Sequence, residues 1–358
     1  MHIAIIIENI TKRAGTERAV VSLANMLVNS NKYNVTIFSV DSKSGDTGFE
    51  LANKVDIKHF GLNTIERSKI RKIRQYIFLY KRLRDLKKQK DIDIIIGTYS
   101  LYNALLTIGR KYKKKIIGWE HFAFDGVSRF HKILRKRFYK KLNAVVVLTN
   151  NDALKYGFIP NSKLYVIPNV ASFVSTTFAE LNNKTIVSLG RLANEKGFDR
   201  LIEIAKVLKD KIPDYKIQIY GEGKAKQNLL NMIADYNLSD FVFINHPVSD
   251  VQSVYKNASL YVLPSRYESF GLVLLEAMTC GVPCVAFDCP SGPRELIDDG
   301  QNGFLVPDND IELMAEKIVL IASDYQLRKT MQSYAIKKAS EFSGENIFLK
   351  WNDLFLGL

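Results

Sequence analysis

Cysteine is scarce in this chain of 358 residues: there are three, and they lie close together at positions 280, 284 and 289. Three cysteines cannot form a framework of disulfide bonds, and they lack the spacing and the partners of a zinc site. No stretch reaches the roughly 18 consecutive apolar residues of a membrane-spanning helix. The apolar start has no basic segment and no cleavage site, so a secretory leader is not expected. We therefore expect a cytoplasmic protein.

The charge of the chain is unevenly distributed. Hydrophobic residues make up 47% and charged residues 25%, which is an ordinary globular balance, and the net charge is +14. Residues 1–180 hold 32 Lys and Arg against 14 Asp and Glu, whereas the remainder holds 19 against 23. Such an asymmetry suggests that the first half meets an anionic partner. Nucleic acid, acidic lipid headgroups and a phosphorylated substrate are the candidates.

The hydrophobic pattern alternates between short β-branched runs and longer amphipathic stretches. This alternation predicts strands followed by helices, and hence α/β sheets covered on both faces. The predicted strands are residues 3–7, 35–40, 92–96, 115–119 and 144–148, then 185–189, 216–220, 241–244, 260–263 and 283–287. The predicted helices are residues 17–29, 68–88, 102–110 and 128–141, then 198–208, 224–236, 271–279 and 311–322.

The pattern loosens at residues 170–183, which read as a linker. We therefore predict two doubly wound, Rossmann-like domains, residues 1–170 and 171–342, with a C-terminal helix at about 343–358 that could pack back on the first domain. Ligands in such sheets bind at the carboxyl ends of the strands. The loops that follow the strands should therefore face each other across a cleft.

Two loops carry features of anion binding. The first strand is followed by a loop with Gly15 that opens a helix, where free N–H groups favour an anion. This loop is not the Gly-x-Gly-x-x-Gly pattern of a dinucleotide site. In the second domain, Gly190 lets the backbone approach a ligand, while Arg191 and Lys196 offer cations suited to a diphosphate. An ordinary capped loop and solvated surface cations are the alternatives.

The stretch 264–278 is the most informative. Glu268 lies in a loop after an apolar strand, and the following residues open a nearly apolar helix that contains Glu276. A carboxylate can accept two hydrogen bonds from ribose hydroxyls, and a helix start can hold a phosphate. Glu268 as a helix cap and Glu276 as a surface charge is the alternative. It fits poorly, because a carboxylate among apolar residues needs a partner.

The spacing of Glu268 and Glu276 around Phe270-Gly271-Leu272 resembles the Glu-x7-Glu signature of family-four retaining glycosyltransferases, which have the two-domain GT-B architecture. The resemblance covers nearly the whole chain. It includes the stretches 15–18, 190–197, 221–223, 281–283, 290–297 and 299–306. The loop has Ala14-Gly15-Thr16 where many relatives have a second glycine, which makes it stiffer without removing the anion site.

The resemblance implies a role for each matching residue. Arg191 and Lys196 would bind the donor diphosphate and stabilise the leaving nucleotide without a metal. Glu276 would hold the ribose, and Glu268 would lie near the hydroxyls of the transferred sugar. The remaining donor-binding positions would be Gly15, Gly190, Gly221, Pro247, Ser269, Phe270, Gly271 and Leu272. No cofactor is expected, because the nucleotide sugar, which we expect to be UDP-linked, is a substrate.

His121 follows the strand that ends at Trp119-Glu120, so we expect it at the ligand edge of the first domain. Relatives place a histidine there, close to the donor sugar, which makes His121 a catalytic candidate. A buried or surface histidine without chemistry is the alternative. His2, His59, His131 and His246 have weaker contexts and are interpreted as structural.

Two basic amphipathic stretches, 67–90 and 129–141, interleave Ile, Phe, Tyr and Leu with Lys and Arg. Such helices suit an anionic bilayer surface, and the alternative is a solvated helix flank. The acceptor in the family is often a lipid-linked sugar.

We therefore expect a hexosyltransferase that acts on a lipid-linked glycan in bacterial capsule, exopolysaccharide or lipopolysaccharide synthesis, peripheral at the inner face of the plasma membrane. A basic protein that binds nucleic acid or an anionic surface on a non-catalytic scaffold is the second hypothesis, although no nucleic-acid-binding motif supports it. An epimerase or phosphorylase is the third.

Overall fold

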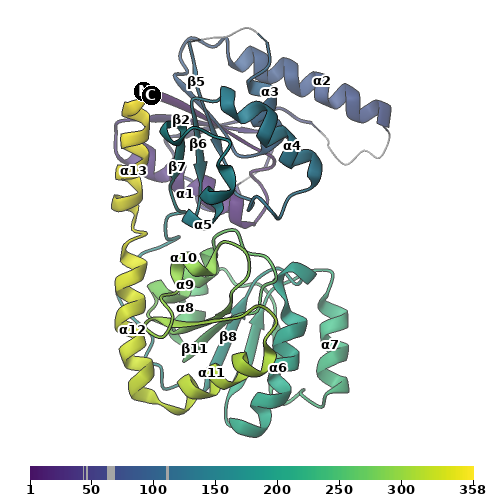
Figure 1. The fold of residues 1–358 in the computed structure, drawn as a ribbon, viewed down its shortest axis with the longest axis vertical. Helices are drawn as coiled ribbons and strands as arrows, with labels where there is room; N and C mark the ends of the chain where they lie inside the picture. The colour runs from purple at the N-terminus through teal and green to yellow at the C-terminus, as the bar shows by residue number, and fades with distance from the viewer. Residues whose placement is uncertain (43, 46, 63–68, 110–112) are drawn as a thin grey trace. The chain divides into compact units, whose positions relative to one another are not determined.

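The computed structural model describes the chain except residues 43, 46, 63–68 and 110–112. The chain divides into two compact units, residues 1–172 with 344–358, and residues 173–343 (Figure 1). Each unit is built on one parallel sheet, so the predicted α/β class with two Rossmann-like domains is confirmed. None of the helices among the described residues has the length and hydropathy to cross a bilayer.

The first unit contains a seven-stranded sheet in the order β3-β2-β1-β4-β5-β6-β7. Its strands are β1 (His2–Ile7), β2 (Asn34–Ser39), β3 (Val55–His59), β4 (Ile94–Gly97), β5 (Lys115–Trp119), β6 (Ala144–Val147) and β7 (Leu164–Val166). Its helices are α1 (Gly15–Asn29), α2 (Lys69–Leu86), α3 (Ser100–Leu106), α4 (Arg129–Phe138), α5 (Asn150–Ala153) and α13 (Gly344–Gly357). Short 3₁₀ turns are η1 (Tyr139–Lys141), η2 (Leu154–Tyr156) and η3 (Asn161–Lys163).

The second unit contains a six-stranded sheet in the order β10-β9-β8-β11-β12-β13. Its strands are β8 (Thr185–Leu189), β9 (Lys216–Tyr220), β10 (Val242–Asn245), β11 (Leu260–Leu263), β12 (Cys284–Phe287) and β13 (Gly303–Val306). Its helices are α6 (Phe198–Lys211), α7 (Lys226–Asp235), α8 (Val251–Lys256), α9 (Leu272–Thr279), α10 (Pro293–Leu296), α11 (Ile311–Ser323) and α12 (Tyr325–Ser340), and η4 (Asn194–Lys196) is a 3₁₀ turn.

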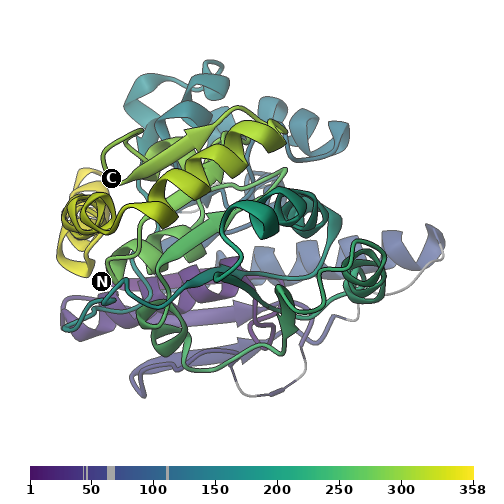
Figure 2. The same ribbon diagram turned by 90° about the horizontal axis from the view of Figure 1, so that it is seen from below.

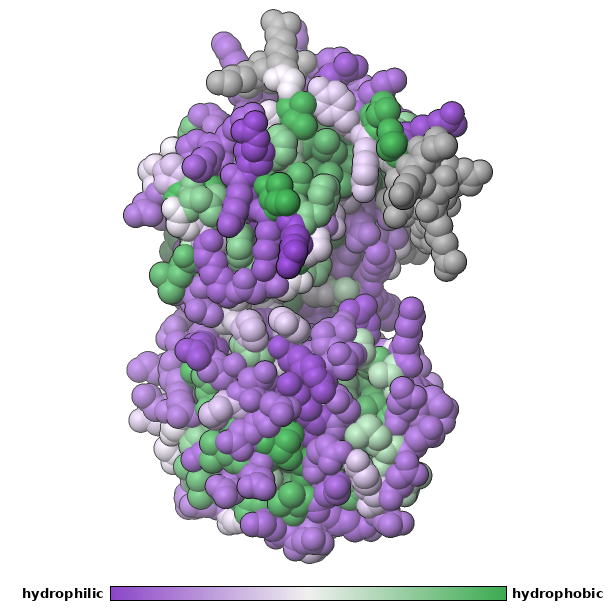
Figure 3. All heavy atoms as spheres, turned by 45° about the vertical axis from the view of Figure 1, so that its right-hand side comes forward, coloured by the Kyte–Doolittle hydropathy of each residue, from purple (hydrophilic) through white to green (hydrophobic). Residues whose placement is uncertain are grey.

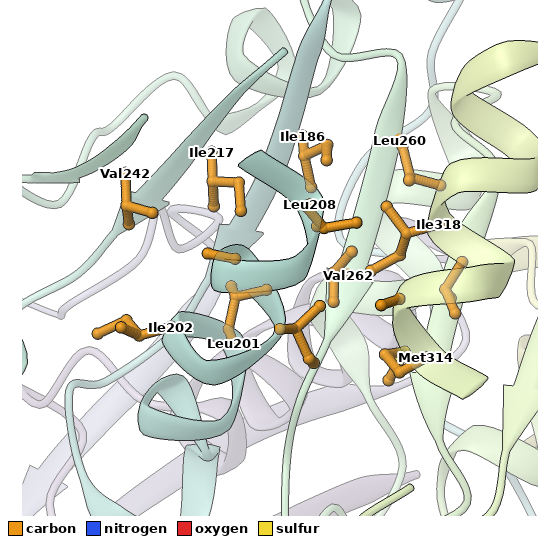
Figure 4. Packing of buried hydrophobic residues seen from close by; sticks show 14 of the residues in the cluster. Ile186, Leu201, Ile202, Leu208, Ile217, Val242, Leu260, Val262, Met314 and Ile318 are labelled. Atoms are coloured by element: carbon orange, nitrogen blue, oxygen red, sulfur yellow. The ribbon is translucent and has the colours of Figure 1, made fainter. Parts of the chain in front are cut away.

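Burial explains why these runs become strands. In the second unit α6 contacts α7 and α11, while α9 contacts α8 and α12 (Figure 2). Between α6, α11 and the sheet lies a core of fully buried aliphatic side chains (Figure 4). Among them are Ile186, Ile217 and Val262 from three neighbouring strands. Strands covered in this way carry near-continuous apolar residues, which is the pattern that the sequence shows.

In both sheets the strand order reverses beside the first strand of the unit. β1 pairs with β2 on one side and β4 on the other, and β8 pairs with β9 and β11, all in parallel register. At such a reversal, the loops that follow the two adjacent strands run to opposite sides of the sheet. This leaves a crevice between the loops at the carboxyl ends of the strands. The topology therefore predicts the ligand edge: beside β8 and β11 in the second unit, and beside β1 and β4 in the first.

Several elements were not predicted. The strands β3, β7 and β13 are short or partly exposed, so they lack the continuous apolar run on which the predictions relied. Helices α8 and α10 are one or two turns long, and α12 has a weak apolar periodicity. The helix expected over 128–141 ends at Phe138 and continues as the turn η1.

The C-terminal helix α13 belongs to the first unit. Trp351 meets Trp119 edge to face, with ring centroids 5.2 Å apart, and both side chains are buried. The hydroxyl of Tyr33 donates a hydrogen bond to Oδ1 of Asn352 at 2.9 Å, and its ring packs against Phe355. Aromatic burial of this size fastens the last segment of the chain to the sheet that the first segment begins.

Candidate functional site

In the second unit, the loops after β8 and β11 meet through an ion pair. Nζ of Lys196 lies 2.6 Å from Oε2 of Glu268, and the two side chains are 25% and 13% exposed. Both belong to the predicted site, and they come from segments 72 positions apart in the chain. A cation and a carboxylate at the ligand edge of a parallel sheet can bind a phosphate and a hydroxyl side by side.

Close backbone approach allows these loops to meet. A Cβ on Gly197 would lie 2.0 Å from the carbonyl oxygen of Pro264, and its φ of +66° is in the left-handed region. Only glycine fits such a position without moving the neighbouring backbone. A Cβ on Gly221 would likewise lie 2.0 Å from the carbonyl oxygen of Gly190, whereas one on Gly190 would make ordinary contacts.

The loops after β8 and β11 are also joined by hydrogen bonds that the sequence analysis did not foresee. The guanidinium of Arg266 donates to both carboxylate oxygens of Asp199, at 2.7 and 2.6 Å. It also donates to the carbonyl of Asn194, and the backbone N–H of Arg266 donates to the carbonyl of Glu195 at 2.9 Å. The sequence contained one indication of this contact, because an arginine stands two residues before Glu268. Its partner Asp199 could not be identified, since it lies far away in the sequence.

Arg191 and Pro247 lie on the exposed side of the same edge. Arg191 is 71% exposed and pairs with Glu195, so its guanidinium is held by a neighbour rather than by the sheet. Pro247 is exposed in the loop after β10. The backbone N–H of Gly221 donates to the carbonyl of Asn245 at 3.1 Å, which extends the β9–β10 pairing to this loop. The structure thus places Arg191 and Pro247 near strand ends. Among the described residues, no hydrogen bond or ion pair joins either of them to Lys196 or Glu268.

The start of α9 supplies backbone donors. Gly271 is the N-cap with a φ of +94°, and Leu272 begins the helix. The first N–H groups of a helix lack the usual acceptor four residues earlier. In α9 the N–H of Leu274 donates instead to the carbonyl of Gly271 at 2.9 Å, so Leu272 and Val273 are the candidate donors. Ser269 and Leu272 are half-buried, whereas Phe270 is 2% exposed and packs edge to face on Phe342. Phe270 can therefore reach a ligand only through its backbone, because its ring is committed to the core.

Glu276 lies in the middle of α9 and is 1% exposed. The hydroxyl of Tyr255 donates to its Oε2 at 3.2 Å. The surface-charge alternative is therefore wrong. The expectation that a carboxylate there needs a partner is confirmed.

In the first unit, Gly15 begins α1 directly, two residues earlier than predicted, and the N-cap Ala14 makes no side-chain capping bond. Gly15 is exposed, and a Cβ there would meet no atom within 4 Å. The glycine is therefore not required by close packing. Glu17 in the first turn is buried, and this burial raises the pKa of its carboxyl.

His121 follows β5, as predicted, and is 6% exposed. Its ring packs on Trp119 with centroids 4.1 Å apart. Burial lowers the pKa of His121 to about 3, so the imidazole is neutral near pH 7. Its Nε2 has no hydrogen-bond partner among the described residues. A buried nitrogen in this state is a group that a ligand hydroxyl could satisfy.

A buried ion pair supports the segment that carries His121. Glu120 is 3% exposed and accepts hydrogen bonds from Arg135 and from the hydroxyl of Tyr139. Asn103 donates to the same hydroxyl at 3.0 Å, and Arg135 also donates to the carbonyl of Phe122 at 3.0 Å. The sequence analysis counted Arg135 among the surface cations, which is wrong. The indication in the sequence was Glu120, because a carboxylate directly after a buried strand needs a partner.

The spacing Asp-x-Asp, which a metal-dependent site could use, occurs twice in the chain, and in both places the carboxylates already have protein partners. Asp93 accepts a bond from the backbone N–H of His2 at 2.8 Å, and Asp91 contacts the ring of His2 before β4. Asp310 caps α11, and Asp308 pairs with Arg200. Where the structure describes the chain, no group of three or more His, Cys, Asp or Glu side chains is arranged to hold a metal.

Comparison with known proteins identifies relatives of both units. The family model described as Glycosyl transferases group 1 matches residues 175–338, and that described as Glycosyltransferase Family 4 matches residues 13–171. A Haemophilus influenzae protein named an uncharacterized glycosyltransferase is 30% identical over 98% of this chain and 99% of its own length. The amylovoran biosynthesis glycosyltransferase AmsD of Erwinia amylovora is 29% identical over 98% of each chain.

Solved structures share the fold. A TarM variant of Staphylococcus aureus in complex with fondaparinux, alpha-GlcNAc-glycerol and UDP superposes with a TM-score of 0.83 at 18% identity, covering 99% of both chains. At that identity the likeness concerns the fold alone.

The neutral state of His121 predicts a pH dependence. In the unfolded chain a histidine takes up a proton below about pH 6.5, whereas the folded state does not until about pH 3. The contribution of the neutral His121 ring to the free energy of unfolding is therefore fully present above about pH 6.5, and it is lost as the pH falls below that value. We expect the destabilisation caused by His121→Asn to shrink by about 2 kcal/mol between pH 7 and pH 5, measured by urea unfolding. His246→Asn at an exposed loop is the control, and an equal destabilisation at both pH values would contradict a neutral buried ring.

Proposed function

Because this chain belongs to glycosyltransferase family 4, we propose that it transfers a hexose or N-acetylhexosamine from a UDP-linked donor to a lipid-linked glycan, with retention of configuration. In this reaction the bond between the anomeric carbon and the diphosphate oxygen breaks. A bond from the same carbon to an acceptor hydroxyl oxygen forms, the hydroxyl proton is released, and the nucleoside diphosphate leaves. Charge therefore develops on the departing diphosphate.

The observation that carries this proposal is the Lys196–Glu268 pair at the edge of β8 and β11. Lys196 would donate to the diphosphate, where its charge is worth most as the leaving group becomes more anionic. Glu268 would accept from a hydroxyl of the sugar. The free N–H groups at the start of α9 would bind the sugar or the phosphate, and Arg191 would turn from Glu195 to the diphosphate. Lys196, Arg191 and the N–H groups of α9 would stabilise the developing negative charge without a metal, whereas Glu268 would orient the sugar.

The first unit would serve as the acceptor-binding domain and the second as the nucleotide-sugar-binding domain. Support for the first role comes from His121, whose neutral ring offers an unpartnered Nε2 beside β5. A neutral imidazole can accept or donate a hydrogen bond to a sugar hydroxyl, but it contributes no charge. Support for the second comes from the Lys196–Glu268 pair at the ligand edge of its sheet.

A surface polysaccharide pathway is the proposed setting. AmsD is named for amylovoran biosynthesis, and a further relative, from Staphylococcus aureus, is named a poly(ribitol-phosphate) alpha-N-acetylglucosaminyltransferase. That second protein is 33% identical over 66% of this chain. These names support a bacterial cell-surface glycan as the acceptor class.

The first unit would bind an anionic membrane surface through α2 and α4. Ile73 and Ile77 are 58% and 51% exposed, and Arg74, Lys81 and Arg84 are exposed on the same helix. Hydrophobic side chains lie among hydrophilic ones on this unit, which is at the top of the space-filling view (Figure 3). On the first unit, a hollow is lined by Ile73, Tyr76, Ile77, Tyr80, Leu105 and Ile108. Exposed cations beside apolar side chains suit acidic lipid headgroups.

This surface is smaller than the sequence indicated. Lys87 is 3% exposed and donates to the carbonyls of Leu106 and Ile108, both at 2.9 Å. Arg135 is bound to Glu120. Residues 67, 68, 111 and 112 lie outside the described part of the chain. On α4, Phe130 and Ile133 are 52% and 63% exposed, and Arg129, Lys136 and Arg137 are exposed too. We therefore assign membrane contact to the exposed positions of α2 and α4.

The second hypothesis, a non-catalytic basic protein, would leave the second unit without a substrate. A turnover assay distinguishes this hypothesis from the enzyme hypothesis. Release of nucleotide from a sugar donor in the presence of a lipid-linked acceptor extract requires the enzyme, whereas salt-sensitive binding to RNA or DNA without such release would favour the alternative.

Loss of the Lys196 amine is expected to reduce catalysis strongly. In a screen of UDP- and GDP-sugars that measures nucleotide release in EDTA, Lys196→Ala should be slower by roughly 30- to 1,000-fold, since a charge-assisted transition-state contact is worth about 2–4 kcal/mol. Lys184→Ala is the matched control, because Lys184 pairs with Asp214 at the amino end of the same sheet. Turnover of Lys196→Ala near the wild-type rate would remove this lysine from the mechanism, and a strict need for added manganese would contradict a metal-free site.

Glu276→Gln tests the ribose contact. The amide keeps an oxygen that can accept from Tyr255, so the fold should survive, but it loses the charge that strengthens bonds from ribose hydroxyls. We expect the affinity for UDP, measured by calorimetry, to fall about tenfold, which is roughly 1.4 kcal/mol. Unchanged affinity together with a lowered melting temperature would return Glu276 to a purely structural role.

Charge reversal on α2 tests the membrane surface. We expect the protein to bind liposomes that contain phosphatidylglycerol and to release them as salt screens the charges. The triple variant Arg74→Glu, Lys81→Glu, Arg84→Glu should bind at least roughly 100-fold less tightly, because each cation contributes on the order of 1 kcal/mol. The control is the triple variant Lys211→Glu, Lys224→Glu, Lys337→Glu, which makes the same change in net charge at exposed positions of the second unit. It should bind as tightly as the wild type. Equal binding to neutral phosphatidylcholine liposomes would contradict an electrostatic surface.

A further inference from the structure

Arg266 occupies a position between the two loops of the candidate donor site. It stands two residues before Glu268, and its partner Asp199 stands three residues after Lys196. The guanidinium reaches Asp199 with two nitrogens and Asn194 with one of them, while the backbone N–H groups of Arg266 and Tyr267 both donate to the carbonyl of Glu195, at 2.9 and 3.3 Å. Arg266 is therefore bonded both to the short turn η4, which carries Lys196, and to the first turn of α6, which follows it.

The turn η4 needs such support. It is a single 3₁₀ turn of three residues, with no side-chain cap. A lysine side chain has high rotamer entropy, and a contact that fixes it has to offset that loss. A planar guanidinium that binds a carboxylate through two parallel bonds fixes direction as well as distance. Although burial alone would raise it, the bonds from Arg266 hold the pKa of Asp199 below its usual range, so the carboxylate is charged near pH 7.

Arg266 is not itself arranged as a phosphate ligand. Both terminal nitrogens of its guanidinium are directed to Asp199, and one is shared with a backbone carbonyl. Lys196, in contrast, has Glu268 as its partner, which is itself half-buried at the ligand edge. The two cations therefore have different tasks, although they lie on neighbouring loops.

We propose that Arg266 and Asp199 are positioning residues that clamp the Lys196 turn against the Glu268 loop, and so set the separation of the two groups that meet the donor. This inference rests on the proposed function for its catalytic consequence only. The clamp acts through Lys196, so removing it should have no effect once Lys196 is gone. A residue that merely stabilised the fold would add its effect in either background.

Steady-state kinetics test the catalytic consequence. We expect Arg266→Ala to lower kcat/KM for the sugar donor by roughly 10- to 100-fold, with most of the loss in kcat because the sugar and nucleotide contacts remain. In the Lys196→Ala background the same change should cost less than about threefold. Arg266→Lys, which can make one bond to Asp199 instead of two, should be intermediate. The matched control Asp214→Ala breaks an ion pair at the opposite edge of the sheet and should act as wild type.

A chemical readout tests the clamp without relying on activity. Trinitrobenzenesulfonate modifies free lysine amines, and peptide mapping by mass spectrometry gives the rate at each lysine. Arg266→Ala and Asp199→Asn should raise the rate at Lys196 several-fold and leave Lys184 unchanged. In Asp214→Ala the rate at Lys184 should rise and that at Lys196 should not.

The outcomes separate the two proposals. If the wild-type protein turns over no sugar donor, the proposed function fails, and the labelling rates still decide the clamp. If Arg266→Ala leaves both the labelling of Lys196 and kcat/KM at wild-type values, the clamp is wrong while the function stands. Equal losses from Arg266→Ala in the wild-type and Lys196→Ala backgrounds would also overturn it. If Arg266→Ala does not fold, the same criteria apply to Arg266→Lys and Asp199→Asn.

Discussion

The parallel pairing of β8 with β11 is the constraint on which the second unit's site depends. Leu260 and Tyr261 stand beside Ile186 and Val187, so the chain leaves both strands at the same edge although 70 or more positions separate them. Gly197 then allows the first loop to touch the carbonyl of Pro264. With any side chain at that position the backbones would have to separate, and Lys196 could not lie within a hydrogen bond of Glu268.

Much of this arrangement could be predicted from the sequence. Parallel strands buried on both faces consist of near-continuous β-branched residues, and such runs mark β1, β4, β8 and β11 without ambiguity. The rule that ligands bind at carboxyl strand ends then selects the loops that hold Lys196 and Glu268. Glu276 was identified for a physical reason, because a carboxylate on an otherwise apolar helix must have a partner. Tyr255, whose hydroxyl donates a hydrogen bond to Glu276, is one such partner.

The rest depends on long-range pairing, which local patterns do not reveal. Lys87 and Arg135 look like members of a solvated basic stripe, yet one caps backbone carbonyls near α3 and the other neutralises Glu120 inside the first unit. The partnership of Arg266 with Asp199 is equally hard to predict, because it joins the loop after β11 to the first turn of α6, 67 positions away in the sequence. Short strands such as β7 were missed because three half-buried residues carry too little pattern.

The proposed reaction requires that the second unit bind a diphosphate through Lys196. Calorimetric titration with UDP, UMP and uridine, and with the matching guanosine series, tests this claim directly, since the three ligands of a series differ only in phosphate. We predict that the nucleoside diphosphate binds roughly 10- to 100-fold more tightly than the nucleoside, and that most of this preference is lost in Lys196→Ala. Equal affinity for nucleoside and diphosphate in the wild-type protein, or a preference that the loss of the lysine leaves unchanged, would contradict it.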